Sequence, residues 1–175
     1  MKSVIRSLAL GAAMLCAASA QAIGPARVGN AYYEDIFQGG SCSAGSCLEY
    51  SFSTTPMDAY VRIKHVACLV INPSTIPITR AILQIWNGSP GGTNSQLLKY
   101  LPIPVPEPRV ESANNVYAFN SETLLLAGPG RYIALSLQSP YTLNATTSGC
   151  GITGDLIRRN RGCLIVCQRA RPRTH

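Results

Sequence analysis

The sequence predicts an all-β protein: a single antiparallel β-sandwich or jelly roll stabilised by disulfides. Short stretches in which apolar and polar residues alternate recur along the chain, and this alternation is the side-chain period of a strand. Clusters of Gly, Pro, Asn and Ser separate these stretches, and no long pattern with the period of a helix follows residue 22. An even set of cysteines in the same region is typical of an exported, disulfide-stabilised domain.

Residues 1–22 have the pattern of a secretory signal peptide. Lys2 and Arg6 precede a short apolar run at residues 8–18, and Ala20-Gln-Ala22 fits a signal cleavage site. The run is shorter than the ~20 residues that span a bilayer, and no later stretch approaches that length. We therefore expect an exported protein, secreted or periplasmic, with no transmembrane segment after signal removal.

The first predicted strands precede the centre of the chain. Residues 31–37 are expected to form an edge strand. Residues 41–47 form a loop of small residues whose two cysteines are able to bond with each other. Leu48, Tyr50 and Phe52 alternate with polar residues, which predicts a half-buried strand.

Residues 60–72 are predicted to form the central strand. Arg62 and Lys64 share one face of its first half, and Cys68 follows on the same face. The opposite face is apolar and is predicted to point inward throughout: Val61, Ile63, His65, Ala67, Leu69 and Ile71. This strand is expected to be the spine of the fold.

The second half of the chain repeats the pattern. Residues 78–86 are predicted to be a strand with Ala81, Leu83 and Ile85 on one face and Arg80, Ile82, Gln84 and Trp86 on the other. A proline-rich connection at residues 102–108 is expected to be extended and poor in hydrogen bonds. The remaining predicted strands are residues 97–101, 116–120, 123–126, 131–138 and 150–157.

Basic charge is concentrated at the C-terminal end. Six arginines follow Leu156, whereas residues 23–155 hold seven basic and eight acidic residues. A nearly neutral body argues against a nucleic-acid-binding domain. We divide the chain into a signal peptide (1–22), a sandwich domain (23–157) and a basic, cysteine-containing tail (158–175). The tail is either a solvated terminus or a contact for an anionic envelope surface.

Six cysteines follow the signal peptide: Cys42, Cys47, Cys68, Cys150, Cys163 and Cys167. Three disulfides among them allow 15 pairings, and spacing does not choose between these. Only two histidines, His65 and His175, accompany them, and no Cys-x-x-Cys pair occurs, so neither a metal site nor a cofactor is expected.

Three short motifs occur in a recognisable order: His65-Val-Ala-Cys68, Ala118-Phe-Asn-Ser-Glu-Thr-Leu-Leu125 and Cys150-Gly-Ile-Thr-Gly154. Together they resemble small uncharacterised exported bacterial proteins with a β-sandwich pattern, over about residues 60–155. The resemblance implies a Cys68–Cys150 bridge between an early and a late strand, and it implies no activity. The arginine-rich end of the chain departs from the pattern of that group.

The sequence offers little for catalysis. His65 is the only histidine in the body, and a hydrogen-bonded interior or boundary histidine is the favoured interpretation. No nucleophile elbow, phosphate loop or dinucleotide motif occurs. Glu34 and Asp35 are adjacent and therefore point apart in a strand, and the other acids are scattered. A polysaccharide or cell-wall hydrolase is the alternative to a non-catalytic protein.

The better candidate for binding is Trp86, with Arg80 and Gln84 on the same strand face. Aromatic planes beside amide and guanidinium groups suit sugar rings, which have apolar faces and hydroxyl edges. Tyr60, Tyr100 and Tyr132 are candidates to extend such a surface, whereas the simpler interpretation is that Trp86 only covers its sheet. The leading hypothesis is a non-catalytic exported interaction module for carbohydrate or an envelope surface. A structural surface protein without a small-molecule site is the third.

Overall fold

Two antiparallel sheets packed face to face form the domain, in a computed structural model that describes residues 25–29, 31–38, 47–72, 76–141, 143 and 147–158. The described strands are β1 (Ala26–Val28), β2 (Tyr32–Gln38), β3 (Cys47–Ser51), β4 (Ala59–Asn72), β5 (Arg80–Trp86), β6 (Leu97–Ile103), β7 (Arg109–Glu111), β8 (Asn114–Ala127), β9 (Tyr132–Gln138) and β10 (Thr147–Arg158). None of the described segments is a helix long and apolar enough to cross a membrane.

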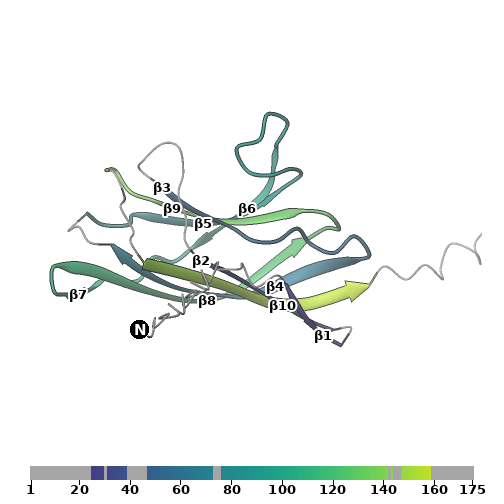
Figure 1. Cartoon of the computed structure of the whole chain (residues 1–175), viewed down its shortest axis with the longest axis horizontal. Helices are drawn as coiled ribbons and strands as arrows, with labels where there is room; N and C mark the ends of the chain where they lie inside the picture. The colour runs from purple at the N-terminus through teal and green to yellow at the C-terminus, as the bar shows by residue number, and fades with distance from the viewer. Residues whose placement is uncertain are drawn as a thin grey trace, which may run out of the picture.

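The larger sheet has the strand order β1-β2-β10-β4-β8-β7, and the smaller has the order β3-β9-β5-β6. Figure 1 shows them as two layers, with β3, β9, β5 and β6 above the strands of the larger sheet. Alternate side chains of both sheets meet between the layers, where Tyr33, Tyr50, Leu83 and Leu135 have no exposed surface. The all-β sandwich prediction is therefore confirmed.

Several strand boundaries differ from the predictions. β8 is one continuous strand where two short ones were expected, and β1 and β7 were not predicted. β6 continues through Pro102, which pairs with Ile82. Because β6 is at the edge of its sheet, a proline there can be accommodated without losing a hydrogen bond on both sides.

The Cys68–Cys150 disulfide is present and joins residues 82 positions apart in the sequence. The two cysteines are direct partners in the pairing of β4 with β10, with Cα atoms 4.1 Å apart, and both are buried. Cys47 is also disulfide-bonded. Cys42, Cys163 and Cys167 lie outside the described residues, as do the signal peptide and, after Arg158 at the end of β10, the basic tail.

The prediction that one parity of β4 points inward along its whole length is wrong. Val61 and Ile63 are buried, but after them Val66, Cys68 and Val70 are the buried residues. Leu69, predicted to point inward, is half exposed. A register irregularity between Ile63 and His65 inserts a residue and reverses the inward parity.

The irregularity extends across three neighbouring strands. The β4 span from Ile63 to Cys68 is matched by the shorter span from Gly154 to Cys150 in β10. On the other side, β8 uses the longer span from Leu125 to Phe119. At this point β4 therefore has one more residue than β10, and β8 has one more residue than β4. Such bulges bend the strands and increase their twist.

Gly154 lies where β10 passes this bulge. A Cβ atom at this position would lie 2.9 Å from the Arg62 carbonyl carbon, closer still to the Arg62 oxygen, and 3.0 Å from the Ile63 Cα. All three are backbone atoms, which cannot rotate away as a side chain does. Only glycine fits this approach of the two strands.

Candidate functional site

The three residues singled out for binding all lie on β5. Ala81, Leu83 and Ile85 point into the core, as predicted. Arg80, Gln84 and Trp86 alternate with them and face away from the larger sheet; Arg80 is exposed and the other two are half-buried. The outer face of the smaller sheet is therefore the first candidate surface.

The sheet register adds two tyrosines to this surface. Tyr132 of β9 is the direct partner of Trp86, and Tyr100 of β6 is the direct partner of Gln84. Partners across antiparallel strands point to the same side with Cβ atoms about 5 Å apart. Tyr100 is 60% exposed. We call Trp86, Gln84, Tyr100 and Tyr132 the aromatic face.

Trp86 and Gln84 are joined by a hydrogen bond. The indole Nε1–H of Trp86 donates to Oε1 of Gln84 over 3.1 Å. Because an indole nitrogen only donates, this contact orients the Gln84 amide and leaves its NH₂ group as two further donors. The bond holds the flat aromatic surface and the amide in a fixed relation.

Arg80 and Tyr60 do not join the aromatic face. Arg80 is at the other end of β5, about 20 Å from Trp86 at ~3.3 Å per residue. Between them, Ile82 and its β9 partner Ser136 are buried although they belong to the same face. Tyr60 is in β4 of the opposite sheet. The structure thus brings Trp86 and Gln84 together with two tyrosines, but not with Arg80.

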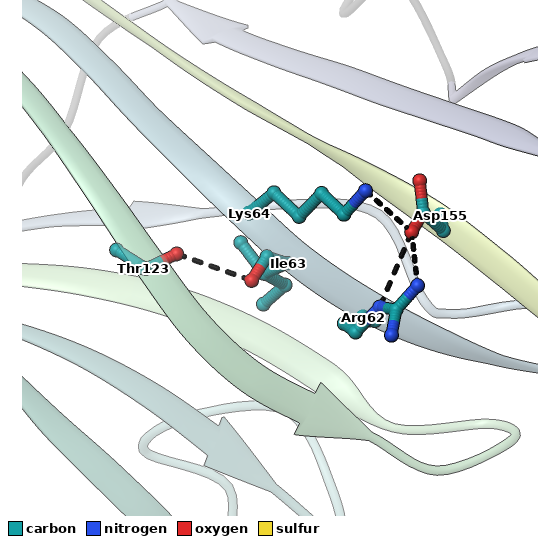
Figure 2. A network of polar contacts seen from close by, with 5 residues as sticks. All are labelled: Arg62, Ile63, Lys64, Thr123 and Asp155. Atoms are coloured by element: carbon teal, nitrogen blue, oxygen red, sulfur yellow. Dashed lines mark hydrogen bonds and ion pairs between the residues drawn. The ribbon is translucent and has the colours of Figure 1, made fainter.

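A cluster of charges lies on the outer side of the larger sheet, at the bulge. Asp155 Oδ2 accepts from Arg62 Nη2 at 2.5 Å and from Arg62 Nε at 3.2 Å, and it lies 2.8 Å from Lys64 Nζ. Figure 2 shows both cations pointing to this one carboxylate. Hydrogen bonds from Lys64 and Arg62 lower the pKa of Asp155, so this group remains an anion. An ionised, doubly paired carboxylate is unsuited to act as a general acid.

The backbone beside this cluster is tied to the next strand. Thr123 Oγ1 donates to the Ile63 carbonyl oxygen over 3.2 Å, as Figure 2 shows. His65, predicted to point inward, lies on the outer side because of the bulge, where it is half-buried. Its Nε2 hydrogen-bonds with Oδ1 of Asn120. This is the hydrogen-bonded boundary histidine that the sequence favoured.

Asp35 is a buried carboxylate that the sequence did not single out. It is 2% exposed and accepts from the Ser53 backbone N–H at 2.6 Å, from Ser53 Oγ at 3.3 Å and from Tyr33 Oη at 3.3 Å. Burial raises the pKa of Asp35, against the opposing effect of the Ser53 hydrogen bonds. Burial also raises the pKa of Tyr33. Glu34 faces the opposite way, as expected for its adjacent position.

A cavity of about 200 Å³ opens at the edge of the sandwich where β6 passes over β8. It is lined by Tyr60, Ile85, Leu98, Lys99, Leu126, Gly128 and Arg131. No carboxylate is among these residues, so this cavity lacks the acid pair that a glycosidase uses. Within the described ranges, no three His, Cys, Asp or Glu side chains gather in a way that would hold a metal ion.

Comparison with known proteins adds no assignment. The chain matches no model of a protein family, and no curated protein is significantly similar to it.

Proposed function

We propose that this protein is a non-catalytic, exported interaction module that binds carbohydrate through the aromatic face. The observation behind the proposal is the register that sets Tyr132 opposite Trp86 and Tyr100 opposite Gln84. Aromatic side chains on one face of a sheet suit the apolar C–H faces of sugars. The Gln84 NH₂ group and the tyrosine hydroxyls are available for sugar hydroxyl edges.

Export is part of the same proposal. A disulfide at Cys68–Cys150 is typical of an oxidising compartment, and residues 1–22 have the pattern of a secretory signal. A secreted or periplasmic protein meets polysaccharides of the cell envelope or of the surroundings. These are the carbohydrates that the aromatic face would encounter.

A glycan array followed by calorimetric titration of the oxidised protein tests the proposal. We expect a neutral oligosaccharide to bind, Trp86→Ala to abolish binding and Tyr100→Ala to weaken it about tenfold, as for other aromatic contacts in binding sites. Tyr141→Ala is the matched control, because Tyr141 is 63% exposed and follows the far end of β9. Since Tyr100 is largely exposed, its variant separates lost binding from lost folding.

Two outcomes would contradict the proposal. Binding that survives both Trp86→Ala and Tyr100→Ala would place the carbohydrate elsewhere. A panel without any bound glycan, together with self-association at raised concentration, would favour the structural protein. A chain ending at Arg158 tests separately whether an anionic envelope surface is bound by the residues that follow.

A further inference from the structure

The residues that line the cavity at the sandwich edge are different from those of the aromatic face. Its walls come from both sheets: Tyr60 and Leu126 from the larger, Ile85 and Leu98 from the smaller. Ile85 points inward whereas its neighbour Trp86 points outward, so the smaller sheet itself separates the cavity from the aromatic face. An inference about the cavity is therefore independent of carbohydrate binding.

The size of the cavity limits its occupant. An apolar cavity of roughly 150 Å³ in a protein core can hold one benzene molecule. The volume here is about 200 Å³, with isoleucine, leucine and tyrosine side chains in its walls. A single ring or a short alkyl chain bearing one small polar group fits this space, whereas a lipid or an oligosaccharide is too large.

Two cations bring positive charge to the end of β8. Lys99 Nζ donates to the Leu126 carbonyl oxygen over 3.2 Å, so this side chain reaches from the smaller sheet to the larger one. A Cβ atom at Gly128 would lie 3.8 Å from Arg131 Nε, so the Arg131 guanidinium lies beside the residues that follow β8. Lys99 keeps two N–H donors, and within the described ranges the guanidinium makes no hydrogen bond or ion pair.

The turn that holds Arg131 is fixed in place. Thr55 is buried; its Oγ1 donates to the Gly128 carbonyl oxygen and accepts from the Arg131 N–H, both over 2.7 Å. The backbone N–H of Thr55 donates in addition to the Arg131 carbonyl oxygen over 2.8 Å. A site whose backbone is already ordered loses little conformational entropy when a ligand binds.

We propose that this cavity is a binding site for a small apolar anion, namely a ring or short alkyl chain that carries a carboxylate. The apolar part occupies the space between Ile85, Leu98 and Leu126. The carboxylate faces Lys99 and Arg131, where charge-assisted hydrogen bonds are available. No acidic residue lines the cavity to repel it.

Methyl-detected NMR titration of the oxidised, isotope-labelled protein tests this site, with benzoate as the anionic probe and benzyl alcohol as the neutral one. We expect benzoate to shift the Ile85, Leu98 and Leu126 methyl signals and to bind about tenfold more tightly than benzyl alcohol. The double variant Lys99→Gln/Arg131→Gln is expected to remove this preference. Arg109→Gln is the matched control, because that exposed arginine is in β7, away from the cavity.

A cavity-filling variant separates the apolar from the ionic contribution. Gly128 does not have a positive φ, and an added Cβ would meet Arg131 and Tyr60 at ordinary contact distances of 3.7–3.9 Å. Gly128→Val is therefore expected to keep the dispersed spectrum of a folded protein and to weaken both probes at least tenfold. Unchanged binding in this variant, or shifts scattered over the surface, would overturn the site. Equal binding of both probes would overturn its selectivity for anions.

Discussion

Gly154→Ala is predicted to be the most destabilising single-methyl addition in β10. The new Cβ would lie within 3.0 Å of three backbone atoms of Arg62 and Ile63. Relief requires β4 and β10 to move apart at the bulge, next to the paired Arg62 and Asp155. Overpacking of this kind costs typically 1–3 kcal/mol. The reduced freedom of the unfolded chain offsets only about 0.4–1 kcal/mol.

Taking the middle of both ranges, the expected net loss is about 1.3 kcal/mol in the free energy of unfolding. With a urea dependence of about 2 kcal/mol per molar, the unfolding midpoint falls by roughly 0.7 M. Urea titration followed by the fluorescence of Trp86, the single tryptophan of the chain, measures this midpoint. The disulfide should be kept oxidised throughout, so that only the bulge is perturbed.

Two glycines of the same strand are matched controls. A Cβ at Gly149 would lie 3.9 Å from the Phe37 carbonyl oxygen, and one at Gly151 would lie 3.7 Å from the backbone carbonyl oxygen of Asp35. Both are ordinary contacts, so Gly149→Ala and Gly151→Ala are expected to be neutral or to stabilise by up to about 1 kcal/mol. If Gly154→Ala unfolds at the same urea concentration as Gly151→Ala, the close approach of β4 and β10 is refuted.

Three further predictions concern the disulfide and two titrating carboxylates. Cys68→Ala/Cys150→Ala is expected to lower the free energy of unfolding by about 4.5 kcal/mol, the chain-entropy value for a loop of roughly 80 residues; in urea titrations a loss below about 1 kcal/mol would contradict it. Because the pKa of Asp35 is raised above 3.8 in the folded state, its contribution to stability declines as pH rises from 3.8 through the folded pKa. Asp35→Asn should abolish this decline in thermal unfolding between pH 3 and 7. Asp155 has a lowered pKa, so its stabilising contribution is present above 3.8 and is lost as pH falls below that value. Asp155→Asn should therefore destabilise the protein more at pH 7 than at pH 2. A larger destabilisation at pH 2 would refute the assignment for Asp155, and a decline that persists in Asp35→Asn would refute the assignment for Asp35.

The alternation of side chains was enough to predict the strands, but not the bulge in β4. Both faces of the second half of this strand are apolar: Ala67 and Leu69 alternate with Val66, Cys68 and Val70. Hydrophobicity alone cannot tell which of these two sets is buried, so an inserted residue leaves no trace in the pattern. Gly154 is a local signal, since a glycine inside a strand indicates a bulge or a close backbone approach, but Gly149 and Gly151 of the same strand give the same signal without such an approach. Gly154 is in β10, whereas the bulge that requires a glycine there is in β4, so the glycine does not show which strand carries the inserted residue.

The two proposed sites differ in how far the sequence could reveal them. Trp86 and Gln84 are on one face of one strand, so a period of two was sufficient to group them. Their tyrosine partners depend on strand order and register, which the sequence of β5 does not contain.

The cavity depends on tertiary structure altogether. Its lining residues come from four strands and a turn, and its two cations, Lys99 and Arg131, are far apart in the sequence. They come together because β6 passes over the end of β8 and because Thr55 holds the turn that contains Arg131. Because the two cations approach the cavity from a strand and from a turn, the double variant Lys99→Gln/Arg131→Gln is needed to remove its positive charge as a unit.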